Sequence, residues 1–145
     1  MHPIESQADI AAALPAHLVQ FERFANCGHA VVPDAPEGTR SAFLKLGARR
    51  YMVISIAMTA ALVRCDPAGR IVSTRLAVGS CSPVARRLPE LEAAVTGSRP
   101  DAVVVDPAHL SALSPIDDLR GTAGYRAEVV AEHCARAIRM AAGHE

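Results

Sequence analysis

The stretch Tyr51–Cys65, YMVISIAMTAALVRC, decides the fold class. Its even-numbered positions are all apolar over nine residues, and residues two apart share one face of a strand. The period therefore predicts a β-strand over about 52–65, with the even row on the core face and the odd row partly covered. The run is too short for a transmembrane helix. The even row consists of Ile54, Ile56, Met58, Ala60 and Leu62.

Further strands are predicted on both sides of this run. The segment SAFLKL, residues 41–46, alternates in polarity and precedes it. The sequence Asp66-Pro67-Ala68-Gly69 follows it and predicts a hairpin turn, because Pro presets φ and Gly accepts a positive φ. Ile71–Val78 then returns as the partner strand and ends near Gly79. Together these segments predict a three-stranded antiparallel sheet over about 41–46, 52–65 and 71–79.

Helical patterns follow the strands. Pro89 suits the first position of a helix over about 89–96, with Gly97 as its stop. Asp106 is a good N-cap for a helix over about 106–113, and Thr122 caps a long helix over about 122–141. The long helix carries an apolar stripe at three- and four-residue spacing: Ala127, Val130, Ala131, Cys134, Ala137, Ile138 and Ala141.

The order of strands first and helices after predicts an α+β fold, with helices on one face of an antiparallel sheet. The pattern is clear only beyond the turn-rich linker that ends near Gly38. We therefore expect residues 1–38 to be a poorly defined segment and linker, and residues 39–145 to be the α+β domain.

Composition narrows the classes of function. The 145 residues contain 15 Lys and Arg against 15 Asp and Glu, so the net charge is zero and gives no reason to bind nucleic acid or an anionic membrane. The N-terminus shows no secretion signal, which predicts a cytoplasmic protein. The four cysteines, Cys27, Cys65, Cys81 and Cys134, form no C-x-x-C pair and are expected to be buried thiols.

Catalytic and metal-binding patterns are absent from the sequence. There is no glycine-rich phosphate loop and no G-x-S-x-G nucleophile motif. No two of the six histidines stand four apart within one predicted helix, so no zinc site and no catalytic residue is expected.

Two charged loops allow two interpretations each. Asp117 and Asp118 form either an acid/base pair or, as we favour, a cap for the following helix and a partner for Arg120. Arg49 and Arg50 lie in a turn between strands, either solvated or close to an anionic cofactor or partner subunit.

Three segments, in this order and spacing, resemble the C-terminal domain of the flavoprotein subunits of molybdenum hydroxylases, the carbon monoxide dehydrogenase and xanthine dehydrogenase group. They are SAFLKLGARRYMVISI (41–56), RIVSTRLAVGSCSP (70–83) and PIDDLRGTAGYR (115–126). The resemblance covers about residues 32–140.

Four motifs carry this resemblance in register. The family's Arg-Arg turn corresponds to Arg49-Arg50, and its D-x-x-G-R hairpin to Asp66–Arg70. Its A-L-G-G strand end corresponds to Ala77–Arg86, and its P-x-x-D-x-R-x-S-x-x-Y-R helix start to Pro115–Arg126. Two positions depart from the pattern: Val53 stands where an acidic residue is common, and Ser80 stands where the strand end has its second glycine.

The resemblance implies a role in a complex. Such complexes hydroxylate a substrate at molybdenum and pass electrons through iron–sulfur clusters to FAD. The family binds most of FAD with two preceding domains, and the residues before Val32 do not resemble them. We therefore expect a domain that contributes a wall near FAD and a docking surface for the FAD-binding, iron–sulfur and molybdenum-binding subunits, with no FAD bound to this chain alone and no catalysis by it alone.

The candidate site residues follow from the resemblance and from the loops. Arg49 and Arg50 are candidates for the flavin side. The candidate partner-binding residues combine charge with an aromatic ring, as interface hot spots do: Arg49, Arg50, Tyr51, Asp117, Asp118, Arg120, Tyr125 and Arg126. Two other hypotheses stay open, a non-catalytic interaction module that self-associates and binds no FAD, and a small unrelated α+β enzyme. A truncated reading frame is a further explanation of the N-terminal segment.

Overall fold

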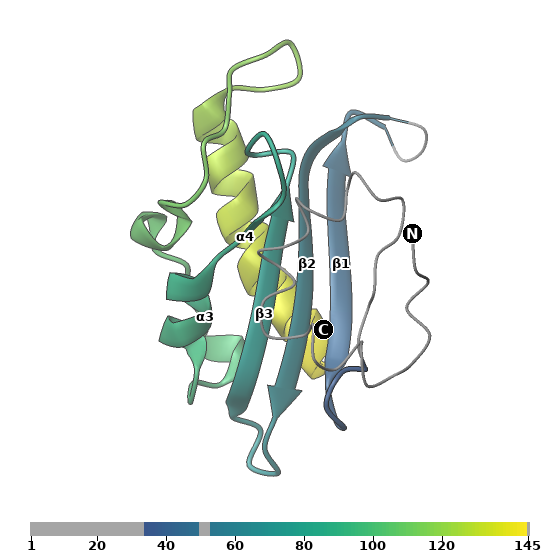
Figure 1. Ribbon diagram of the computed structural model, residues 1–145, viewed down its shortest axis with the longest axis vertical. Helices are drawn as coiled ribbons and strands as arrows, with labels where there is room; N and C mark the ends of the chain where they lie inside the picture. The colour runs from purple at the N-terminus through teal and green to yellow at the C-terminus, as the bar shows by residue number, and fades with distance from the viewer. Residues whose placement is uncertain (1–33, 50–52, 145) are drawn as a thin grey trace, which may run out of the picture. The chain divides into compact units, whose positions relative to one another are not determined.

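The computed structural model describes residues 34–49 and 53–144. Residues Gly38–Glu145 form one compact unit, which is the subject of the following paragraphs. Within it, one sheet is packed against one long helix and a set of shorter helical turns (Figure 1).

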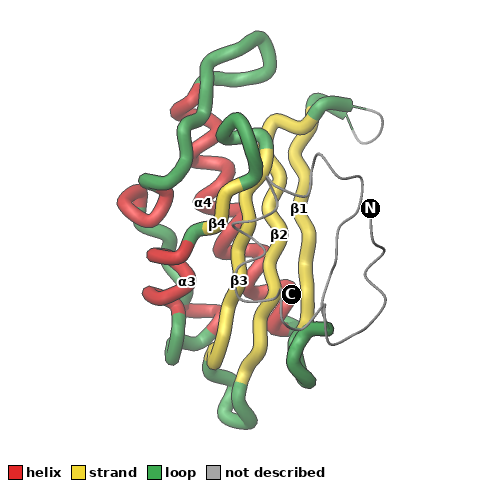
Figure 2. The backbone as a smooth tube through the Cα atoms, in the orientation of Figure 1, coloured by secondary structure: helices red, strands yellow, loops and turns green. Residues whose placement is uncertain are grey.

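The sheet has four strands in the order β1-β2-β3-β4, and every neighbouring pair is antiparallel (Figure 2). The strands are β1 (Arg40–Gly47), β2 (Ser55–Cys65), β3 (Ile71–Gly79) and β4 (Arg86–Arg87). The three predicted strands and their antiparallel pairing are confirmed. The sequence analysis missed β4, because two residues are too few to show any period.

The helical layer is smaller than predicted. It contains α3 (Pro89–Val95) and α4 (Ala123–Ala142), together with 3₁₀ turns at Pro100–Ala102 and Pro107–Leu110. The prediction of a helix over 106–113 is therefore wrong in type and length. Asp106 does cap it, accepting from Ala108 N at 2.8 Å, but only i→i+3 bonds follow before the chain turns away and Ser114 N donates to Cys81 O.

Helix α4 covers one face of the sheet, as predicted. Its buried stripe includes Val130, Cys134 and Ile138, each with no exposed surface. On β2, however, the odd-numbered residues face this core, so the predicted assignment of the even row to the core is wrong. Ala57, Thr59, Ala61 and Val63 are buried on the helix side. Of the even row only Ile56 is buried, whereas Leu62 is 41% exposed and Ile54, just before β2, is 69% exposed.

Side-chain size explains the reversed faces. The odd row of β2 is small at Ala57 and Ala61, and the facing stripe of α4 is small at Ala137 and Ala141. Small residues on both surfaces let the helix lie close to the strand and fill the space between them. Ser55 and Thr59 made the odd row look less apolar, yet both are buried.

Local turn chemistry follows the sequence closely. Gly69 has φ +75° and its N–H donates to Asp66 O, which closes the predicted hairpin. Gly97 has φ +82° just beyond α3, and Thr122 Oγ1 accepts from Tyr125 N at the start of α4. These contacts confirm the predicted hairpin, helix stop and cap.

Glu92 joins α3 to the sheet. This residue is only 7% exposed, and its Oε1 accepts from Leu76 N of β3 at 2.8 Å. Its carboxylate also forms an ion pair with Arg87 of β4. Arg87 is the charged donor for this carboxylate, and a buried charge is costly unless it is paired in this way.

Two of the cysteines, Cys81 and Cys134, are buried as predicted, and Cys65 is half-buried. Burial raises the pKa of Cys134 to about 12, so this thiol is not a nucleophile at neutral pH. Cys27 lies outside the described residues. No described helix combines the length and the apolar character that a bilayer span demands.

Candidate functional site

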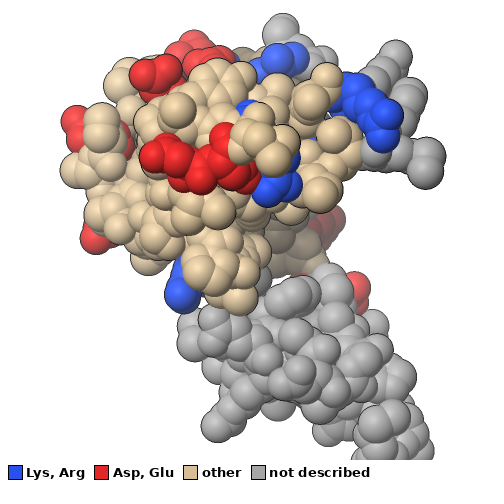
Figure 3. All heavy atoms as spheres, turned by 90° about the horizontal axis from the view of Figure 1, so that it is seen from above, with Lys and Arg blue, Asp and Glu red and all other residues tan. Residues whose placement is uncertain are grey.

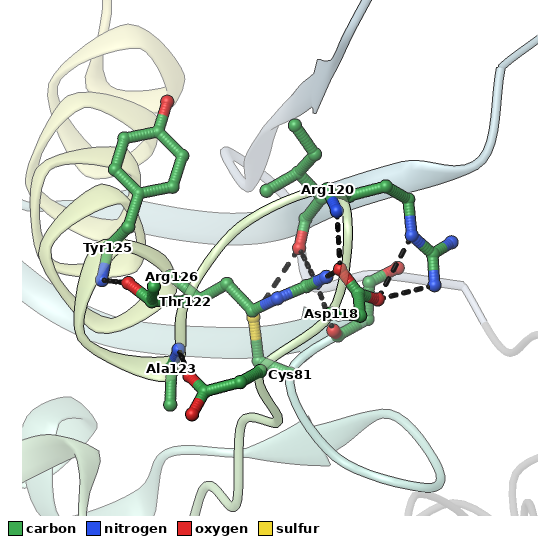
Figure 4. A network of polar contacts seen from close by, with 10 residues as sticks. Cys81, Asp118, Arg120, Thr122, Ala123, Tyr125 and Arg126 are labelled. Carbon is green, nitrogen blue, oxygen red and sulfur yellow. Dashed lines mark hydrogen bonds and ion pairs between the residues drawn. The ribbon is translucent and has the colours of Figure 1, made fainter.

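A network of polar contacts fixes the end of the molecule where α4 begins (Figure 4). Its centre is Arg126, which is only 2% exposed and points from the first turn of α4 into the protein. Its Nη1 donates to Ile56 O at 2.5 Å and to Ser80 O at 3.1 Å. One guanidinium thus joins the start of α4 to the ends of two strands.

Asp118 provides the charge that balances this buried cation. Arg126 Nη2 donates to Asp118 Oδ1 at 2.8 Å, and Arg120 Nη2 donates to Asp118 Oδ2 at 2.6 Å. The backbone N of Arg120 also donates to Asp118 Oδ1. These bonds lower the pKa of Asp118 from 3.8 to about 2, with the hydrogen bond from the Arg120 side chain as the largest cause. The carboxylate is therefore charged at neutral pH and unsuited to act as an acid.

Asp117 has a separate role beside this pair. Its Oδ1 accepts from Ala123 N at 2.6 Å, while Thr122 Oγ1 accepts from Tyr125 N at 3.1 Å. Both contacts satisfy N–H groups that the start of a helix leaves without partners. The favoured interpretation of the two aspartates, a helix cap and a partner for Arg120, is confirmed.

The end of β3 completes the network. Ser80 has φ +66°, a left-handed conformation that no other described non-glycine residue adopts. This conformation directs Ser80 O toward Arg126, and the next residue, Cys81, places its Sγ 3.9 Å from Ile56 O. Burial raises the pKa of the Cys81 thiol, and the neighbouring Arg126 guanidinium partly offsets this rise. Ser80, one of the two positions that depart from the motifs of the resembled family, thus has a conformation that favours glycine.

The structure separates the predicted site residues into an inner and an outer group. Arg126 lies inside, while Tyr125 is 45% exposed and its ring points away from the network (Figure 4). Arg49 is exposed in the turn after β1, and Arg50 and Tyr51 lie outside the described residues.

Seen from above, acidic and basic side chains lie together near the centre of this end of the molecule (Figure 3).

Sequence reasoning missed the apolar tip of the loop before α4. Leu119 is fully exposed and Ile116 is 65% exposed. Backbone bonds in both directions between Asp118 and Gly121 close the loop, so Leu119 stands at the tip of a tight turn. The available signal was the presence of two large apolar residues in a segment otherwise rich in Pro, Asp and Arg.

The contacts of the network organise the loop before α4. A nucleophile needs a base within hydrogen-bond reach, and the Cys81 thiol contacts a backbone carbonyl instead. Across residues 34–49 and 53–144, no group of three His, Cys, Asp or Glu side chains is arranged to hold a metal ion.

A small pocket lies at the opposite end of α4. It measures about 290 Å³ and is lined by the β2–β3 hairpin, the start of β1 and the last turn of α4. Its charged or thiol side chains include Arg40, Cys65 and Asp66. The volume is at the lower limit for a small-molecule site, and the pocket is separate from the predicted site residues.

The comparison with protein families matches this architecture. A family model described as the CO dehydrogenase flavoprotein C-terminal domain matches residues 42–141. The chain belongs to this family. The match includes most of β1, all of β2, β3 and α3, nearly all of α4 and the complete Arg126 network. It confirms the resemblance that the four sequence motifs carry.

Solved structures give the same fold. A CO dehydrogenase from Hydrogenophaga pseudoflava is 28% identical with a TM-score of 0.64, and the match covers 78% of this chain and 40% of that chain. Reconstituted CO dehydrogenase from Oligotropha carboxidovorans is 21% identical, with a TM-score of 0.66 over 79% of this chain and 40% of that one. Quinoline 2-oxidoreductase from Pseudomonas putida 86 is 21% identical, with a TM-score of 0.63 over 78% and 40%.

The chain therefore spans about two fifths of the length of these structural relatives. No curated protein sequence matches it at a significant level.

Proposed function

We propose that this chain acts as a component of a molybdenum-hydroxylase-type oxidoreductase, as the C-terminal domain of its flavoprotein part. The observation that carries the proposal is the family match over residues 42–141. In this role the domain contributes a wall near FAD and a docking surface for the subunits that hold FAD, iron–sulfur clusters and molybdenum. It has no catalytic activity alone.

The helix starts of the described chain do not fit an FAD pyrophosphate. Such a group is held by unpaired backbone N–H groups at a helix N-terminus. The start of α4 is already capped by Thr122 and Asp117. The start of α3 carries Glu90 in its first turn, and its negative charge disfavours an anion there. We therefore infer that residues outside the described part of the chain hold most of FAD.

The proposed docking surface has two parts. The first is the turn Arg49–Tyr51, and the second is the 115–126 loop with the exposed Leu119, Ile116 and Tyr125. The Asp118–Arg126 bond supports this loop from below. A rigid loop loses little entropy on binding, so its exposed apolar tip suits a contact with a partner.

Reconstitution tests the proposal. The full chain is mixed with the CO dehydrogenase flavoprotein polypeptide of Hydrogenophaga pseudoflava, truncated before its own matching segment. Gel filtration with absorbance at flavin wavelengths then follows both proteins. We expect the chain to co-elute with the yellow truncated protein and to slow its loss of FAD. Separate elution with an unchanged rate of FAD loss would contradict the proposal.

The second candidate is an interaction module that self-associates and never meets FAD. The capped and acidic helix starts favour it, because neither α3 nor α4 offers a pyrophosphate site. The same gel-filtration experiment separates the candidates, since a module of this kind elutes as a dimer whether or not the truncated flavoprotein is present.

A further inference from the structure

The sheet face opposite α4 is not covered by any described element. The pairing of β1 with β2 places Phe43 directly opposite Ala60 on this face, and the pairing of β2 with β3 adds Ala77 beside them. Phe43 is 60% exposed and Leu62 is 41% exposed. The face is therefore an apolar surface open in the described part of the chain.

Met58 extends this surface toward the end of β3. A Cβ placed on Gly79 would lie 2.8 Å from Met58 Cε, so the methionine side chain lies across the glycine. The absence of a side chain at Gly79 lets Met58 lie flat. Flat apolar surfaces pack well against a second layer at sheet-to-layer distance.

The pattern of β2 agrees with a sheet that is covered on both faces. Strands buried on both faces have near-continuous apolar sequences, whereas half-exposed strands alternate with polar residues. Between Ile56 and Val63 the only polar residue is Thr59, which lies on the helix side. The even-numbered side chains from Met58 to Leu62 are apolar although they face away from the core. This indicates that a second layer, from outside the described elements, covers them.

The charges on this face have one sign. Strand alternation and register place Lys45, Arg64 and Arg75 on the open side, around the apolar centre. None of the three forms an ion pair with a described residue. Arg64 Nε is buried and has no hydrogen-bond partner. Strands β1, β2 and β3 contain no acidic residue at all.

We propose that this open face, defined by Phe43, Met58, Ala60, Leu62 and Ala77, docks a protein partner whose surface is apolar at its centre and acidic at its rim. It is a second docking surface, distinct from the loops of the proposed function. The apolar centre provides the free energy of association, and the cationic rim selects the partner by charge.

A second copy of this chain does not fit. Stacking two such faces would bring Lys45, Arg64 and Arg75 of each copy together with no carboxylate between them. Like charges within a few ångströms of one another repel, and the repulsion grows as water is excluded. The partner that we propose is therefore a different protein, which supplies the acidic rim.

A charge-reversed copy of the chain tests this chemistry directly. The full-length variant Lys45→Glu/Arg75→Glu presents the same apolar centre with acidic residues on its rim. Fluorescently labelled wild-type chain is titrated with unlabelled wild-type chain and, separately, with the reversed variant, and analytical ultracentrifugation measures the association. We expect binding to the reversed variant to be at least about tenfold tighter, and weaker at high salt.

Substitutions in the labelled chain identify the surface. Phe43→Ser/Leu62→Ser should weaken binding to the reversed variant at least about tenfold, because it removes the apolar centre. The matched control Val104→Ser removes a residue that is 81% exposed elsewhere and should change nothing. The neutral variant Lys45→Gln/Arg75→Gln should bind with intermediate affinity, and it serves as the charge probe if the reversed variant does not fold.

Three results would overturn the proposal. Equal binding to wild-type and reversed chains would make a second copy the occupant. No binding to either the reversed or the neutral variant would show that the face docks nothing. Equal losses from Val104→Ser and from Phe43→Ser/Leu62→Ser would show that the association is non-specific. None of these results depends on FAD, so the proposed function stands or fails separately.

Discussion

Arg126 Nη2 lies 2.8 Å from Asp118 Oδ1, and this bond joins the first turn of α4 to the loop that precedes it. Arg126 is almost fully buried, while the side chain of Asp118 is 18% exposed. The same guanidinium holds Ile56 O and Ser80 O. The bond therefore makes the position of the loop depend on the ends of β2 and β3, although Ile56 and Ser80 lie 70 and 46 residues before Arg126 in sequence.

Replacing Arg126 with Met should destabilise the fold strongly. The change leaves Asp118 with one fewer charged donor and leaves two backbone carbonyls without theirs, and breaking a buried ion pair costs about 3 kcal/mol or more. Urea denaturation followed by circular dichroism measures the free energy of unfolding. The control Arg136→Met removes an exposed arginine from the same helix and should stay within about 0.5 kcal/mol of wild type. Similar small losses in both variants would show that the Arg126 network does not support the fold.

The depressed pKa of Asp118 predicts a stability change in acid. Its pKa is about 2 in the folded protein, below the ordinary value of 3.8, so the folded state binds this proton less readily than the unfolded state. The stabilisation from the charged carboxylate is complete above about pH 4 and is lost as the pH falls toward 2. Asp118→Asn should be less stable than wild type at pH 6, and the difference should shrink between pH 4 and pH 2. Urea midpoints over that range measure this, and a constant difference would refute the explanation.

Ser80→Gly should stabilise the protein. Ser80 has φ +66°, and a left-handed conformation costs a non-glycine residue about 1 kcal/mol relative to glycine. The backbone carbonyl that accepts from Arg126 is kept in the variant. We expect a gain of about 0.5–1 kcal/mol in unfolding free energy, after the larger entropy of glycine in the unfolded chain is subtracted. Ser80→Ala keeps the strained conformation and should bring no gain. A gain of equal size with alanine would locate the effect in the hydroxyl group instead.

The double substitution Arg49→Ala/Arg50→Ala tests the docking turn. Surface changes usually alter the unfolding free energy by less than about 0.5 kcal/mol, so melting should be nearly unchanged. Binding to the truncated flavoprotein should weaken, as measured by co-elution in gel filtration. Arg99→Ala, which breaks an exposed ion pair with Asp101, is the control that should leave binding intact. If the double variant melts several degrees lower and binds normally, the turn is structural.

Much of the fold was predictable because its signals are local. The hairpin at Asp66–Gly69, the cap at Thr122 and the stripe of α4 depend on residues within a few positions of one another. The pairing of Asp118 with Arg120 is local for the same reason. The family resemblance joined these pieces into one domain, and the family match confirms it.

The rest depends on contacts between distant residues. The choice between the two apolar rows of β2 is set by the small side chains of α4, which the strand sequence does not contain. The burial of Arg126 depends on carbonyls of Ile56 and Ser80, and backbone carbonyls have no sequence signature. The 106–113 segment has the start signal of a helix, but its connection to Cys81 ends it after one turn.

We propose that this domain serves a flavoprotein whose FAD is held by residues outside it. The most direct measurement is the flavin content of the full chain, purified alone, incubated with excess FAD and passed through gel filtration. The account predicts a colourless protein with far less than one FAD per chain, because the starts of α3 and α4 offer no free pyrophosphate site. A yellow protein that retains one FAD per chain would contradict it.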